Sequence, residues 1–337
     1  MQTVSTDTTL QEAYTITDRP RRSAALFLLD NAIVVALLVA VVVFSLASPQ
    51  VFFSPTNLIS ILRFASLGGI IVACYSCAMI AGQLDLSTSQ VGAFSGVVFA
   101  LLFQVLRWPL PLALTAALAC AGTVGWFNGQ LINRVGLPSL VTTLAVGTLV
   151  YGLSYLIVDG FGTASVMRLT RPPLRSLVNA DLLGIPVSIY LMFALYAVIY
   201  VLLNHTRFGA HLYAVGGNPQ AARLNGIRVP QLISTVLVMT AMAAGVATIL
   251  LAGRQLAVTP TTTVLASPLV AALFAGVSLS GGVGRIERTL IGVLFFSVLG
   301  IGLSILSLPP FVRFTVEGLA FVLALLTDSI RTHLEQR

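Results

Sequence analysis

The chain contains ten apolar stretches that are about as long as a membrane-crossing helix. Such a helix needs about 20 apolar residues, because the hydrocarbon core of a bilayer is roughly 30 Å thick. The stretches lie at 26–46, 62–81, 89–106, 110–132, 138–158, 187–203, 231–252, 264–281, 288–307 and 311–328. Only 9% of the residues are charged, so the lipid bilayer must cover much of the surface. The sequence therefore predicts an all-α, multi-pass transmembrane bundle of about ten helices.

Short polar ends flank one apolar domain. We expect a cytoplasmic N-terminal tail at 1–25, a single transmembrane domain at 26–330 and a cytoplasmic C-terminal tail at 331–337. With the N-terminus inside, eleven Arg residues fall on inner segments and seven on outer segments. Positive charge accumulates on the cytoplasmic side of membrane proteins, so we expect both termini inside.

The basic residues and the cysteines indicate neither nucleic-acid binding nor metal binding. The net charge is +7, but the arginines are scattered singly between apolar stretches instead of forming one basic face. Cys74 and Cys77 have the C-x-x-C spacing of some metal and redox sites. On a membrane helix the same pair is an ordinary set of small packing residues, which we favour. We expect no nucleic-acid partner and no metal.

The longest inner connection, at about 204–230, has its own local structure. Gly216-Gly217 predicts a turn, Asn218 is a good N-cap and Pro219 is a good first helical residue. Asn225-Gly226 then favours a left-handed stop. The sequence therefore predicts a short amphipathic helix at the cytoplasmic surface. It is either a docking element for a soluble partner or an ordinary surface helix.

Two polar breaks interrupt the apolar pattern. Asp85 lies in the short break between the second and third stretches, where a carboxylate is costly in lipid. It either caps the N–H groups of Ser87 or Thr88, or it contacts a transport pathway. The Gly/Ser-rich break at 276–284 lacks the lysine and spacing of a phosphate-binding loop. It is either a tight turn that permits close helix packing, which we favour, or a gating hinge.

Four segments, in order along nearly the whole chain, resemble one known family. They are Gly82–Ser87 (GQLDLS), Leu137–Leu144 (LPSLVTTL), Thr206–Ile227 and Phe274–Gly284 (FAGVSLSGGVG). Together they are similar to the permease subunits of ribose/xylose/galactose-type ATP-binding-cassette (ABC) importers. Three departures occur. Gln83 and Ala275 stand where the family pattern has glycine, and Ser87-Thr88-Ser89 stands where it has Ser-Val-Gly.

The resemblance implies a function and a set of partners. Two permease copies, identical or paralogous, would enclose a pathway in the bacterial plasma (inner) membrane. An extracytoplasmic sugar-binding protein would deliver a small polar solute, which we expect to be a monosaccharide, to the outer face. An ABC ATPase subunit would bind ATP and Mg, so this chain itself would hold no cofactor.

The resemblance also implies which residues carry these roles. The expected ATPase-coupling residues are Arg207, Phe208, Gly209, Gly216, Gly217, Asn218, Pro219, Ala222, Arg223 and Gly226. The candidate pathway or gate residues are Gln83, Asp85, Ser87, Ser278, Ser280, Gly281 and Gly282. No catalytic residue is expected in this chain.

Two other functions are alternatives to an importer subunit. An ion-coupled secondary transporter would place charged residues and broken helices at matching positions of two repeats, and only Asp85 stands out. A membrane enzyme would show clustered His, Asp or Glu near one interface, and no such cluster is present in the sequence. Both patterns favour the importer subunit, with the secondary transporter as the alternative.

Overall fold

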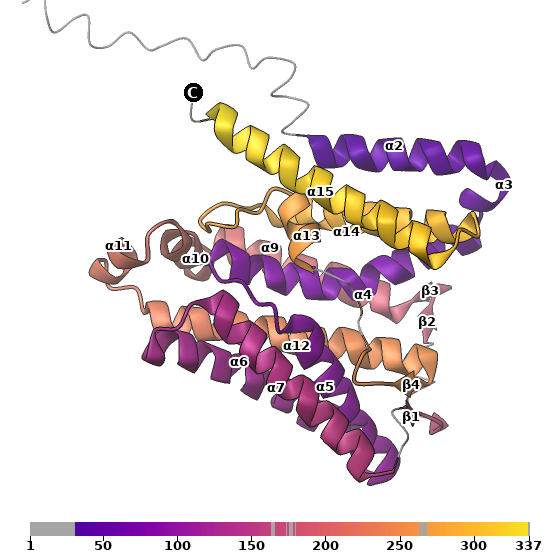
Figure 1. Ribbon diagram of the computed structural model, residues 1–337, viewed down its shortest axis with the longest axis horizontal. Helices are drawn as coiled ribbons and strands as arrows, with labels where there is room; N and C mark the ends of the chain where they lie inside the picture. The colour runs from indigo at the N-terminus through magenta and orange to yellow at the C-terminus, as the bar shows by residue number, and fades with distance from the viewer. Residues whose placement is uncertain are drawn as a thin grey trace, which may run out of the picture.

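The protein is mostly helical, and seven of its described helices are long and apolar enough to cross a membrane (Figure 1). The computed structural model describes residues 31–162, 166–172, 174, 178, 180–262, 264 and 268–335. The predicted tail at 1–25 and the last two residues lie outside this part. The seven candidate spans are α4 (Pro55–Ile80), α5 with η2 (Thr88–Val105), α6 with η3 (Leu110–Val135), α7 (Ser139–Gly160), α9 (Val187–His205), α12 (Val229–Gln255) and α14 (Ile286–Ile305).

Other helices and four short strands complete the described fold. The helices are α2 (Ala32–Ala47), α3 (Pro49–Phe52), α10 (Arg207–Gly217), α11 (Pro219–Leu224), α13 (Pro268–Phe274) and α15 (Pro310–Glu335). Strand β1 (Met167–Arg168) pairs antiparallel with β4 (Ala257–Val258), and β2 (Asp181–Leu182) pairs with β3 (Ile185–Pro186). The expectation of an all-α, multi-pass fold is confirmed, and the four two-residue strands are small additions to it in the described residues. These strands occur because the polar connections must satisfy their own backbone groups.

Helix α12 forms the centre of the bundle and packs against α4, α5 and α6. Glycines allow the backbones to approach closely. A methyl group added at Gly92 of α5 would lie 3.1 Å from the carbonyl oxygen of Ala244, and one at Gly125 of α6 would lie 2.9 Å from Cβ of Ala241. Small residues at helix interfaces are the usual means of tight packing in lipid.

The apolar stretch at 264–281 is not a spanning helix. Among the described residues of this stretch, only Pro268–Phe274 is helical, and the helix ends where Gly276 adopts a positive φ of 84°. Ala271, Ala272 and Leu273 are nevertheless buried within the protein. Non-helical backbone is tolerated at membrane depth when protein surrounds it. Hydropathy alone therefore overestimates the number of helices at this position.

The two ends of the bundle differ in structure. In Figure 1, α10 and α11 lie at the left end of the bundle, whereas the four strands lie at the right end. The pairing of β1 with β4 joins the long connection after α7 to the residues that follow α12.

The described part of the stretch at 26–46 lies in α2, and the stretch at 311–328 lies in α15. The predicted polar break between the second and third stretches is confirmed, because α4 ends at Ile80 and α5 begins at Thr88.

Candidate coupling and pathway site

Helix α11 is the short capped helix that the sequence predicts. The side-chain Oδ1 of Asn218 accepts hydrogen bonds from the backbone N–H groups of Gln220 and Ala221, both at 3.0 Å. Pro219 is the first helical residue, and Gly226 adopts a φ of 80° just after the helix ends. This N-cap satisfies two backbone donors that a helix start leaves free.

Helix α10 was not predicted, and the expected turn at Gly216-Gly217 is wrong. Both glycines belong to the last turn of α10. Phe208, Leu212 and Val215 recur at helical spacing, and the latter two are completely buried. This periodicity could have identified the helix. The Gly-Gly pair concealed it because glycine is a poor helix former.

The coupling candidates separate into exposed and buried residues. Arg207, Gly217, Pro219 and Arg223 are exposed, whereas Gly209, Gly216 and Ala222 are buried against the rest of the chain. Leu224, at the end of α11, has 90% of its surface exposed and was not among the predicted residues. Leu224 therefore presents apolar surface beside the exposed Arg223 at the end of α11.

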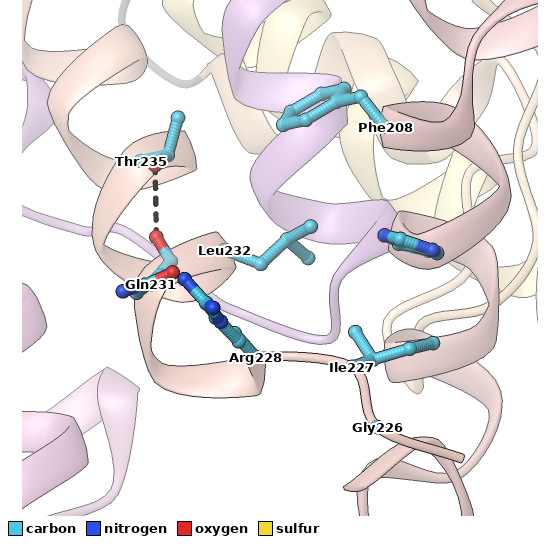
Figure 2. A pocket seen from close by; sticks show the side chains of 8 residues that line it. Phe208, Gly226, Ile227, Arg228, Gln231, Leu232 and Thr235 are labelled. Atoms are coloured by element: carbon cyan, nitrogen blue, oxygen red, sulfur yellow. Dashed lines mark hydrogen bonds between the residues drawn. The ribbon is translucent and has the colours of Figure 1, made fainter.

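A cavity of about 370 Å³ lies beside these helices (Figure 2). Figure 2 shows Phe208 above the cavity, with Arg228 and Gln231 at the start of α12 and Ile227 on the connection from α11. Its lining residues are Phe208, His211, Gly226, Ile227, Arg228, Gln231, Leu232 and Thr235. The lining thus combines apolar side chains with the guanidinium group of Arg228 and the imidazole ring of His211.

We expect Asn218→Ala to loosen α11 without disturbing the bundle. Loss of an N-cap costs about 1 kcal/mol, which corresponds to roughly fivefold faster amide exchange across 220–224. Hydrogen–deuterium exchange of the protein in nanodiscs measures this directly. Gln220→Ala is the control, because that exposed side chain does not cap the helix. Equal protection in both variants would contradict the capping role.

Asp85 acts as a local cap within the break between α4 and α5. Its Oδ1 accepts hydrogen bonds from both the backbone N–H and the hydroxyl of Ser87, the former at 2.9 Å. The hydroxyl of Thr88 donates to the backbone carbonyl oxygen of Asp85 at 2.9 Å. Asp85 is only 2% exposed. These bonds match the capping alternative, and a contact of Asp85 with a solute stays a prediction.

Side chains from α7 and α6 form hydrogen bonds with other residues of the break between α4 and α5. The backbone N–H of Leu84 donates to Oγ of Ser139 at 3.2 Å, and that of Leu86 donates to Oγ1 of Thr143 at 3.0 Å. Nδ2 of Asn128 donates to Oγ of Ser87 at 3.0 Å. The non-helical backbone is thus satisfied by hydroxyl groups, as it must be inside a membrane protein. Gln83 lies nearby and is half-buried.

The Gly/Ser-rich break forms a tight turn. The backbone N–H of Ser278 donates to the carbonyl oxygen of Val283 at 3.0 Å, and that of Gly281 donates to the carbonyl oxygen of Ser278 at 3.3 Å. Gly281 and Gly282 have φ values of 83° and 73°, which favour glycine. Ser280, at the tip, is exposed. The geometry agrees with the tight-turn interpretation.

Comparison with known proteins identifies the family. Residues 57–325 match the family described as the permease component of the branched-chain amino acid transport system. The chain belongs to this permease family. The match covers more than half of the chain and includes α11, the 81–87 break and the 278–284 turn. The chain is therefore a multi-pass membrane protein of a family of transport-system permeases.

Several curated permeases resemble the chain almost from end to end. It is 32% identical over 303 residues to the L-arabinose ABC transporter permease protein AraH of Azospirillum brasilense, covering 89% of this chain and 88% of that protein. It is 30% identical over 294 residues to the ribose import permease protein RbsC of Bacillus subtilis, covering 87% and 90%. The ribose import permease of Haemophilus influenzae is 28% identical over 305 residues, covering 90% and 94%.

For this permease, sequence reasoning missed the residues that support the site. Ser139 and Thr143 lie within the second of the four family segments, LPSLVTTL, but the sequence did not predict their hydrogen bonds to the 81–87 break. Asn128 gave no sequence pattern at all. Among the described residues, no group of three His, Cys, Asp or Glu could hold a metal ion.

Proposed function

We propose that this permease is the membrane-spanning subunit of an ABC importer for a monosaccharide, with a pentose as the preferred candidate. The observation that carries the proposal is the end-to-end similarity to permeases named for L-arabinose and ribose. Helices α10 and α11 would face the cytoplasm, and the strand end would face outward. Both termini would then lie inside, as the distribution of arginines favours.

The partners follow from this arrangement. A separate ATPase subunit would bind ATP and Mg. It would contact α11, where Arg223 and Leu224 are exposed. A binding protein would deliver the solute to the strand end. A second permease copy would complete the pathway, which fits the low burial of α6, of whose span only 22% is buried within the chain.

Alternating access explains how ATP would drive the solute across. ATP binding and hydrolysis in the partner would change the relative populations of outward-open and inward-open permease. A ligand shifts such an equilibrium only by its differential affinity for the two states. Asp85 would not act as a proton relay in this scheme, because ATP supplies the free energy.

Reconstitution tests the proposed function. The chain, its co-expressed ATPase and its binding protein are placed in vesicles, and uptake of labelled L-arabinose, D-ribose and L-leucine is followed with and without ATP. We expect ATP-dependent uptake of a pentose. The control is a complex whose ATPase subunit cannot hydrolyse ATP.

The alternatives give different outcomes in the same experiment. Leucine uptake with ATP would support an importer but contradict a sugar substrate, in line with the description of the family as branched-chain amino acid permeases. Uptake that ignores ATP and disappears with an ionophore would contradict the importer. It would then favour the ion-coupled secondary transporter.

A further inference from the structure

Glycines from three distant parts of the chain meet at the end of α4. We call Gly82, Gly216, Gly281 and Gly282 the glycine junction. The backbone N–H of Gly282 donates to the carbonyl oxygen of Ile80 at 2.8 Å, which fixes the 278–284 turn to the last turn of α4. This bond joins segments that no sequence motif places together.

Gly216 of α10 fits directly into this contact. A methyl group added at Gly216 would overlap both the carbonyl oxygen of Ile80 and the backbone nitrogen of Gly282. A methyl group added at Gly281 would lie 2.8 Å from the backbone nitrogen of Gly82 and 3.0 Å from the carbonyl oxygen of Gly216. The three backbones therefore touch without any intervening side chain.

A side-chain hydrogen bond reinforces the backbone contacts. The hydroxyl of Tyr213, on α10, donates to the carbonyl oxygen of Gly284 at 2.8 Å. Burial raises the pKa of the Tyr213 phenol above its ordinary value, so the hydroxyl stays a donor at neutral pH. Helix α10 thus contacts the 278–284 turn twice, through the backbone of Gly216 and through the hydroxyl of Tyr213.

The junction lies between the surface of α11 and the break that contains Asp85. Asn218 links α10 directly to α11, and Gly82 opens the 81–87 break with a φ of 73°. Packed backbones without soft side chains between them pass a displacement on, because close-packed interiors are stiff. A shift of α11 would therefore reach the break through rigid contacts.

We propose that the glycine junction positions the 81–87 break according to the position of α11, and so couples the ATPase partner to the pathway. This inference rests on the proposed function, since it takes α11 to be the part that the ATPase moves. Gly216 then serves chiefly inside the permease, because it is buried against Ile80 instead of facing the partner.

Gly216→Ala tests the junction in the reconstituted complex. We expect solute uptake per ATP hydrolysed by the assembled complex to fall about tenfold, because the added methyl group displaces α10 from Ile80 and Gly282. Gly160→Ala is the matched control. It adds the same methyl group at the end of α7, where no atom lies within 4 Å, and should leave the ratio unchanged.

Tyr213→Phe provides a milder variant if Gly216→Ala does not assemble. It keeps the ring and removes only the hydrogen bond to Gly284, so we expect uptake per ATP to fall about fivefold with assembly intact. An assembled Gly216→Ala complex with the wild-type ratio, or a wild-type ratio in Tyr213→Phe, would overturn the proposal. A wild-type complex without ATP-dependent uptake would instead contradict the proposed function itself.

Discussion

Asp85→Ala should lower the free energy of unfolding by about 3 kcal/mol, because two donors of Ser87 lose their acceptor in a buried place. Water does not reach this position freely, so the backbone N–H of Ser87, left without an acceptor, is buried at its full desolvation cost. For a protein of this size we expect the Tm in detergent to fall by roughly 4 °C. Thermal unfolding followed by intrinsic fluorescence gives the measurement.

Two further variants separate capping from a pathway role. Asp159→Ala removes an exposed carboxylate at the end of α7 and should leave the Tm unchanged. Asp85→Asn keeps a carbonyl oxygen as acceptor, so a cap predicts near-normal Tm and near-normal uptake. A variant Asp85→Asn that folds normally but transports nothing would contradict a purely structural role. It would assign the carboxylate charge to the pathway.

Gly125→Val should destabilise the bundle about as strongly as Asp85→Ala, because α6 and α12 leave no room for a side chain at Gly125. An added Cβ at Gly125 would lie 2.9 Å from Cβ of Ala241 and would also press on the carbonyl oxygen of Leu237. Overpacking of this kind costs about 1–3 kcal/mol, and rigid backbone on one side favours the upper end. The yield of folded protein in size-exclusion chromatography and the Tm both report it.

The control for this prediction is another helical glycine. Gly152 lies on an exposed face of α7, and a Cβ atom added there would have no other atom within 4 Å. Gly152→Val therefore makes the same change of residue within a helix without creating an overlap. Equal Tm values for the two valine variants would show that α6 and α12 are less closely packed than the structure indicates. A fall confined to Gly125→Val would confirm the contact.

Local patterns in the sequence were sufficient for several features of the fold. Low charge and long apolar stretches determined the membrane class, since the bilayer imposes a minimum length and excludes charge. The polar residues around Asp85 marked the break between α4 and α5. Asn218, Pro219 and Gly226 determined both ends of α11, because capping depends only on neighbouring residues.

Other features depended on contacts between distant residues. In the stretch at 264–281, the described apolar residues Ala271, Ala272 and Leu273 are buried by protein, and hydropathy does not distinguish such burial from contact with lipid. Helix α10 persists through Gly216-Gly217 despite poor propensity, because its apolar face packs on α4 and α9. The meeting of Gly82, Gly216 and Gly282 is likewise invisible in the sequence, since glycine marks a possible close approach but never names its partner.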